Sequence, residues 1–119
     1  MTVCEKGATI QRMAIVDTAE LTVVQRLPGW RGRSFNSPNM TFVHYEFDAG
    51  ASIHEHHHAQ EEVWNVIEGE LEVTIDGVPH LAKPGMVAIT PPNTRHSVRA
   101  LTAGRAIVVD TPLRLDLGE

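Results

Sequence analysis

The stretch GASIHEHHHAQEEVWNVIEG, residues 50–69, decides how the rest of this 119-residue chain is interpreted. It holds four of the seven histidines of the chain within five consecutive positions. Because alternate side chains of a β-strand lie on the same face, His54, His56 and His58 are expected to share one face. His57 is then expected to point away from them.

Acidic residues follow these histidines, and Glu62 can return to the face of His56 and His58 after a short bend. Two imidazoles and one carboxylate on one face form a ligand set that non-haem metal sites use. His96, from later in the chain, is the candidate fourth ligand. The sequence therefore predicts one divalent transition-metal ion per chain, and these ligands permit Fe(II), Mn, Ni, Cu or Zn. Since ligating histidines must be neutral, metal affinity is expected to fall in acid.

The same residues resemble the two sequence motifs of the cupin superfamily. The first motif, G-x5-H-x-H-x3-E-x6-G, is matched by Gly50, His56, His58, Glu62 and Gly69. The second, G-x5-P-x-G-x2-H-x3-N, is matched by Gly85, Pro91 and His96. Two positions of the second motif differ. Asn93 replaces a glycine, and asparagine tolerates the left-handed turn that glycine would serve; Ala100 replaces an asparagine that is not a ligand in the family.

The resemblance covers residues 30–115 and implies an all-β fold, the double-stranded β-helix or jelly roll of cupins. It implies a small, single-domain cupin at 13–119, with its core motifs at 50–69 and 85–100. The first residues, 1–12, lack a clear period and are interpreted as a flexible N-terminal arm.

Two alternatives to this ligand assignment remain. His54 and His56 with Glu61 also form an H-x-H-x4-E string, but that register loses the motif spacing to Gly50 and Gly69. The other alternative is a solvated polar loop that binds no metal, as in low-complexity histidine tracts.

The pattern of apolar residues along the chain independently favours many short strands. Residues 21–24 and 40–47 have strand character, and residues 71–75 alternate cleanly between apolar and polar. Asp76-Gly77 is a strong hairpin signal. Residues 27–33 and 36–39 are interpreted as turns, and residues 11–24 have room for one helical turn at most. Short strands separated by Gly and Pro turns are typical of a sandwich or barrel.

Composition limits the partners of the protein. The formal net charge is −5 and no Lys or Arg run forms a basic patch, so nucleic acid and membrane are not expected as partners. Cys4 is the only cysteine, which is compatible with a cytoplasmic location. A homodimer is expected because a small barrel exposes sheet edges and one apolar sheet face. The segment at 15–24 is the candidate to add strands across the partner.

Several other residues are candidates for proton transfer or substrate binding near the metal. Tyr45, His54 and Glu61 are the candidate proton carriers, although a core tyrosine bonded to the backbone is an equally good interpretation of Tyr45. Candidate substrate contacts are Arg33, Trp64 and Arg114. For Arg33 the simpler alternative is a solvated loop, and for Trp64 it is plain packing.

Two classes of function fit these features. One is a metal-dependent enzyme, an isomerase, lyase or oxygenase, that acts on a small polar metabolite such as a hydroxy acid, keto acid or sugar acid. The other is a non-catalytic ligand-binding or sensor protein with the same barrel.

A narrower alternative comes from the end of the chain. Residues 112–116, PLRLD, are similar to the P-x-R-x-D ending of small cupins that open unsaturated uronate sugars. Those proteins carry an acid in the last strand where Val108 stands here, and usually a glutamine where Glu62 stands.

Overall fold

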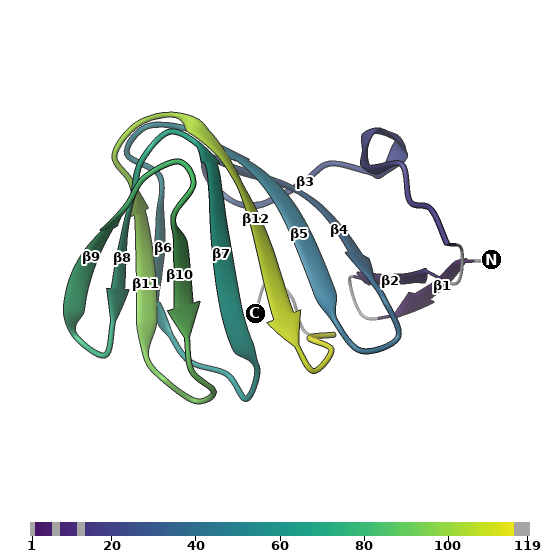
Figure 1. The fold of residues 1–119 in the computed structure, drawn as a ribbon. Helices are drawn as coiled ribbons and strands as arrows, with labels where there is room; N and C mark the ends of the chain where they lie inside the picture. The colour runs from purple at the N-terminus through teal and green to yellow at the C-terminus, as the bar shows by residue number, and fades with distance from the viewer. Residues whose placement is uncertain (1, 6–7, 12–13, 116–119) are drawn as a thin grey trace.

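A computed structural model describes residues 2–5, 8–11 and 14–115 of the chain, and its strands form two facing sheets (Figure 1). The larger sheet runs in the order β1-β2-β4-β5-β12-β7-β10, with β3 paired to β4. Its strands are β1 (Thr2–Glu5), β2 (Ala8–Gln11), β3 (Val24–Leu27), β4 (Trp30–Asn36), β5 (Thr41–Phe47), β7 (Glu61–Glu68), β10 (Val87–Thr90) and β12 (Gly104–Thr111). All its pairs are antiparallel except β2 with β4.

The smaller sheet has the order β6-β11-β8-β9. Its strands are β6 (Ser52–His56), β8 (Leu71–Ile75), β9 (Val78–Ala82) and β11 (His96–Ala100). The expected jelly roll of cupins is confirmed, because consecutive strands β5, β6 and β7 alternate between the two sheets.

The core lies between the two sheets and follows from strand alternation. In β7 every second residue from Glu62 to Val66 is buried, and β12 repeats this pattern from Ala106 to Asp110. Large apolar side chains therefore point inward from both sheets. The buried apolar cluster consists of Trp30, Val43, Phe47, Trp64, Val66, Leu71, Val73, Ala82, Val98, Ala100, Ala106 and Val108.

Two predictions for the first third of the chain are wrong in their boundaries. The strand expected at 21–24 lies at Val24–Leu27, and residues 30–33, expected within a turn, belong to β4. The strand β4 lacks an apolar alternation because its inward positions include Gly32 and Ser34. A side chain at Gly32 would come within 3.0 Å of Tyr45 and Val43, so the small residue makes room for them.

The region before β3 is only partly described. A 3₁₀ turn, η1 (Thr18–Glu20), agrees with the expected limit of one helical turn at 11–24. Strand β3 pairs with β4 of its own chain. The predicted flexible arm at 1–12 includes residues outside the described ranges and stays a prediction; its described parts, β1 and β2, pair with each other.

Turns with positive φ angles join the strands where the sequence indicated them. Asp76 and Gly77 have φ angles of 50° and 80°, which suits the tight hairpin between β8 and β9. Asn93 has a φ angle of 58°, so it takes the left-handed conformation expected at the glycine position of the second motif. No helix in the described part of the chain is long and apolar enough to span a membrane.

Candidate metal centre

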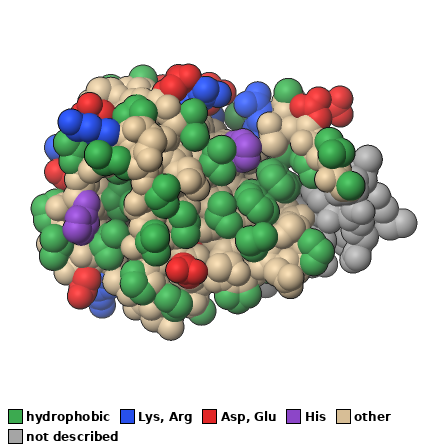
Figure 2. Space-filling view, in the orientation of Figure 1, with side chains coloured by type: hydrophobic (Ala, Val, Ile, Leu, Met, Phe, Trp, Pro, Cys, Tyr) green, Lys and Arg blue, Asp and Glu red, His purple; other side chains and the backbone are tan. Residues whose placement is uncertain are grey.

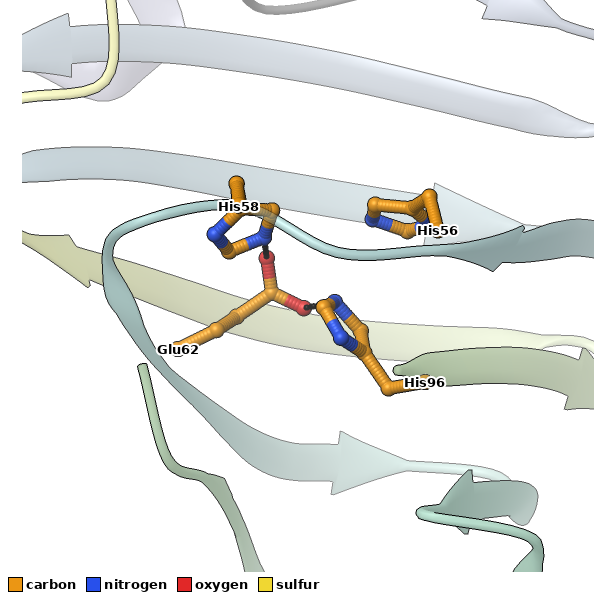
Figure 3. Close-up of side chains that lie close together, drawn as sticks. All are labelled: His56, His58, Glu62 and His96. Carbon is orange, nitrogen blue, oxygen red and sulfur yellow. Dashed lines mark hydrogen bonds and ion pairs between the residues drawn. The ribbon is translucent and has the colours of Figure 1, made fainter. Parts of the chain in front are cut away.

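The four predicted ligands converge at one end of the space between the sheets (Figure 3). His56 ends β6, His58 follows in the loop, Glu62 lies near the start of β7, and His96 begins β11. One candidate ligand atom from each residue lies within 4.8 Å of the others. This confirms the cluster of His56, His58, Glu62 and His96 and favours it over the register built on His54 and Glu61.

Backbone contacts bring the separate segments together. His56 and His96 are register partners across β6 and β11, and their ring centroids lie 4.3 Å apart. The Asn93 backbone N–H donates to the His58 carbonyl oxygen at 2.7 Å. The left-handed turn at Asn93 thus ties the loop that precedes His96 to the loop that carries His58.

Each imidazole is oriented by a hydrogen bond from its Nδ1 to a backbone carbonyl two residues away. His56 Nδ1 contacts His54 O at 2.9 Å, His58 Nδ1 contacts Gln60 O at 3.1 Å, and His96 Nδ1 contacts Thr94 O at 2.8 Å. A carbonyl oxygen only accepts, so each Nδ1 must carry the hydrogen. The Nε2 of each neutral ring therefore keeps its lone pair, which is the form that binds a metal ion.

The carboxylate of Glu62 faces two of these nitrogens. Its oxygens lie 3.2 Å from His58 Nε2 and 3.1 Å from His96 Nε2 (Figure 3). A lone pair and a carboxylate oxygen repel each other unless a positive charge lies between them, supplied by a proton or a metal ion. Three imidazoles and one carboxylate converge here, and this donor set fits a divalent transition ion.

The electrostatics of the buried carboxylate agree with this need for positive charge. Burial alone would raise the pKa of Glu62, but its contacts with the imidazoles of His58 and His96 hold that pKa well below its usual range. Burial likewise opposes charge on His96, yet the contact with Glu62 prevails and raises the His96 pKa. At His56 burial dominates and lowers the pKa. The centre is therefore built to hold one carboxylate beside cationic neighbours.

Trp64 supports the carboxylate from the same face of β7. Its indole N–H donates to Glu62 Oε2 at 2.7 Å, and both side chains are buried. A hydrogen bond to a ligating carboxylate fixes its orientation. Trp64 was predicted as a substrate contact, and that role stays a prediction; the structure adds its hydrogen bond to Glu62.

A cavity of about 160 Å³ adjoins the cluster, and most of the predicted catalytic and substrate-binding residues line it. Tyr45, His54, Trp64 and Arg114 all line it, together with His56 and Glu62. The Tyr45 ring stacks on Trp64 at 5.7 Å. Burial, followed by the nearby Glu62 charge, raises the pKa of Tyr45 to about 12. Its hydroxyl is therefore protonated at neutral pH and can act as a hydrogen-bond donor.

Arg114 approaches the centre from the residues after β12. Its Nη1 lies 3.4 Å from Glu62 Oε1 and 3.6 Å from Asp110 Oδ2. The Arg114 backbone N–H donates to Thr41 Oγ1 at 2.9 Å, and Gln60 Nε2 donates to Leu113 O at 2.9 Å. These contacts anchor the segment that carries Arg114 against the large sheet.

Two other predicted site residues lie outside the cavity lining. Arg33 points to the other face of β4, where it forms an ion pair with Glu46 at 3.4 Å. Glu61 precedes Glu62 in β7, so strand alternation turns it away from the cluster. The structure therefore gathers Tyr45 and His54 near the ligands and separates Arg33 and Glu61 from them.

Several cavity residues were not among the predicted site residues, and three of them are Trp30, Arg26 and Asp110. Trp30 was missed because residues 27–33 were interpreted as a turn, and Arg26 lies between that turn and the strand expected at 21–24; both line the cavity. Asp110 is 1% exposed and its Oδ1 has no hydrogen-bond partner among the described residues. Burial and the neighbouring Glu62 raise the pKa of Asp110 to about 8. Its inward position was available from the alternation of Ala106, Val108 and Asp110.

Comparison with known families gives a match to the Cupin domain family over residues 43–112, which is more than half of the chain. The match includes all four residues of the cluster. A comparison with curated protein sequences finds no significant match.

Solved structures of similar fold span nearly the whole chain. An RmlC-like cupin from Shewanella frigidimarina is 27% identical, with a TM-score of 0.80, over 87% of this chain and 95% of that one. KdgF from a Halomonas species is 25% identical, with a TM-score of 0.79, over 86% and 96%. Oxalate decarboxylase of Bacillus subtilis, studied for its Mn(II) centres, is 21% identical with a TM-score of 0.72, over 82% of this chain and 29% of that one. The last likeness concerns the fold alone.

Proposed function

The chain belongs to the cupin domain family, and from that membership we propose that it is a metal-dependent enzyme acting on a small metabolite that binds through two oxygens. His56, His58, Glu62 and His96 would hold one divalent transition-metal ion. The observation that carries the proposal is the orientation of the three imidazoles, whose Nδ1 hydrogen bonds leave each Nε2 available beside Glu62.

Two features support a reaction site over a purely structural ion site. Four protein ligands do not fill the coordination sphere of an octahedral ion, so positions stay open for a substrate. A cavity adjoins the cluster, and it is lined by groups that can hold a substrate. The bound ion would supply Lewis-acid polarisation of a coordinated substrate oxygen.

The remaining roles fall to side chains of the cavity. Arg114 carries a fixed positive charge beside Glu62 and suits a substrate carboxylate. Tyr45 presents a protonated hydroxyl for a hydrogen bond to a developing negative charge. His54 also lines the cavity and is the candidate to accept or deliver a proton. The substrate class that these groups suit is a 2-hydroxy or 2-oxo carboxylate.

Metal analysis of protein purified without an affinity tag tests the first step of this proposal. We expect close to one ion per chain after reconstitution with Fe(II), Mn, Ni, Cu or Zn in turn. Less than a tenth of an ion per chain with every metal would refute the ion site. Turnover of a panel of hydroxy acids, keto acids and unsaturated uronates by each loaded form then tests catalysis. Tight binding without turnover of any of them would instead indicate a sensor.

We also propose that two copies associate through the outward face of the large sheet. Apolar side chains form one continuous cross-strand row there: Ile89, Val63, Val109, Phe42 and Phe35. Phe35 and Phe42 stack at 4.8 Å, and Ile89 is 56% exposed. Figure 2 shows hydrophobic side chains gathered over this side of the molecule. We call these five residues the outer row.

A second copy of the chain is the occupant that this face suits. Arginines on this face are already paired within the chain, Arg33 with Glu46 and Arg105 with Glu68. Two copies can therefore meet with these arginines already neutralised. The molecule measures 40 × 28 × 24 Å, and such a sheet face is of the order of the ~800 Å² that each partner contributes to a standard interface.

A cytoplasmic location stays a proposal, supported by the single cysteine.

A further inference from the structure

We propose that the substrate carries an apolar group directly beside its metal-binding oxygens, so that this protein takes aliphatic or aromatic 2-hydroxy and 2-oxo acids and rejects sugar acids. The inference rests on the proposed function and narrows it to one substrate class. It comes from the order of side chains on the inward face of the large sheet.

The first inward row across this sheet is polar. The strand registers place Thr90, Glu62, Asp110, Thr41 and Asn36 side by side across β10, β7, β12, β5 and β4. All five are at most 3% exposed. We call these residues the polar row. It includes the metal ligand Glu62, and Arg114 lies against its centre. The charged head of a substrate therefore belongs at this level of the cavity.

The next inward row is apolar at its centre, and Ser34 stands at its β4 end. Trp64, Val108 and Val43 are register neighbours, and each is at most 4% exposed. Beyond them Tyr45 and Gly32 are paired, followed by Trp30 and Phe47. On the facing sheet, Ile53 completes the wall, and Leu27 of β3 also lines the cavity. A substrate held by the polar row thus has the hydrocarbon of Trp64, Val108 and Val43 beside the atoms next to its head. Polar side chains that also line the cavity include Arg26, Ser34, Tyr45 and His54.

This wall discriminates against a polyhydroxylated chain. A hydroxyl moved from water against Trp64, Val108 and Val43 would lose its hydrogen bonds without gaining others from their side chains. Ser34 is the one hydroxyl-bearing side chain in that row. The cavity, at about 160 Å³, is close in size to an apolar protein cavity of about 150 Å³ that admits benzene. It suits a branched aliphatic or single-ring group.

Val108 is the residue that sets this preference. It lies between Trp64 and Val43 in register and two positions before Asp110 on the same inward face. It therefore stands where the polar row gives way to the apolar wall. A polar atom at Val108 would supply a hydrogen bond to a substrate hydroxyl at the carbon next to the head.

Two ligands with the same head and the same number of non-hydrogen atoms test the inference: 2-hydroxyisocaproate, with a branched aliphatic tail, and erythronate, an open-chain sugar acid. Calorimetric titration of the metal-loaded protein should give a dissociation constant on the order of 100-fold lower for 2-hydroxyisocaproate. The Val108→Thr variant keeps the side-chain volume and should reduce that ratio at least tenfold. The matched Val109→Thr variant, whose side chain faces outward, should leave the ratio unchanged.

The tryptophans provide a second, independent measurement. The chain has two, Trp30 and Trp64, and both line this cavity. Their emission should respond to 2-hydroxyisocaproate at concentrations that match the calorimetric titration.

Equal affinity for the two acids, tighter binding of erythronate, or binding of neither would overturn the inference. Ion content is measured on the same samples, and the titrations are repeated on metal-free protein. Failure to retain metal would refute the proposed function, whereas a full metal site with no apolar preference would refute only this inference.

Discussion

The inward and outward faces of β7 and β12 carry opposite chemistry on the same backbone. Glu62 and Asp110 face the metal cluster, while their chain neighbours Val63 and Val109 belong to the outer row. One strand therefore serves a buried polar site and a half-buried apolar outer surface through alternate residues. A shift of one residue in register would exchange the two faces. Substitutions on one face are therefore expected to leave the property of the other face unchanged.

The largest effect is expected from removal of a metal ligand. His58→Ala removes one nitrogen that faces Glu62 at 3.2 Å and should weaken metal affinity by at least about 100-fold, more than loss of a supporting residue usually costs. His57→Ala is the control, because His57 is exposed and lies outside the cluster. Competition titration with a chelator measures both. If His57→Ala lost as much affinity as His58→Ala, the ligand assignment would be wrong.

The second effect concerns the outer row. Val109→Glu introduces a charge at its centre, and burying that charge without a partner is costly. We expect the dissociation constant of the dimer to rise by at least about 30-fold, measured by sedimentation velocity. Metal content should not change, because Val109 faces away from the cluster.

Val78→Glu is the matched control for this surface. Val78 is 54% exposed but lies on β9 of the small sheet, apart from the outer row. It should leave the association unchanged. A wild-type protein that is monomeric at high micromolar concentration would contradict the dimer, and equal dissociation by both variants would assign the interface elsewhere.

A third, smaller effect separates the two tryptophans of the cavity. Trp64→Phe keeps an aromatic ring and removes the hydrogen bond to Glu62 Oε2, so metal affinity should fall about tenfold. Trp30→Phe is the same change at a residue whose indole N–H has no hydrogen-bond partner among the described residues. That variant should retain metal affinity. Similar losses in both would mean that ring packing, rather than the hydrogen bond, orients Glu62.

The sequence was sufficient to predict that His56, His58, Glu62 and His96 cluster, because their spacing matches the two motifs and glycines mark the turns around them. The sequence did not predict strand β4, because its inward positions hold Gly32, Ser34 and Asn36 in place of an apolar alternation. That strand supplies Trp30 and one wall of the cavity.

The two rows across the large sheet were beyond sequence reasoning for a different reason. Each row combines residues from five strands, and single-strand patterns do not give the register between strands. Asp110 could be assigned an inward position from β12 alone. Its place beside Glu62 required the pairing of β12 with β7.

The smallest effect is expected from Glu68→Gln, the counterpart of Glu62→Gln on the same strand. Glu68 is paired with Arg105 at 2.7 Å, but the two side chains are 60% and 54% exposed. Water screens such a pair, so the free energy of unfolding should change by less than about 1 kcal/mol, and metal affinity should stay constant. Glu62→Gln makes the same chemical change where the side chain is 4% exposed and faces two imidazoles, and it should abolish stoichiometric metal binding. Chemical denaturation and chelator competition on both variants measure the contrast. Comparable metal losses would show that the net charge of β7, and not the direct contact with Glu62, governs the ion site.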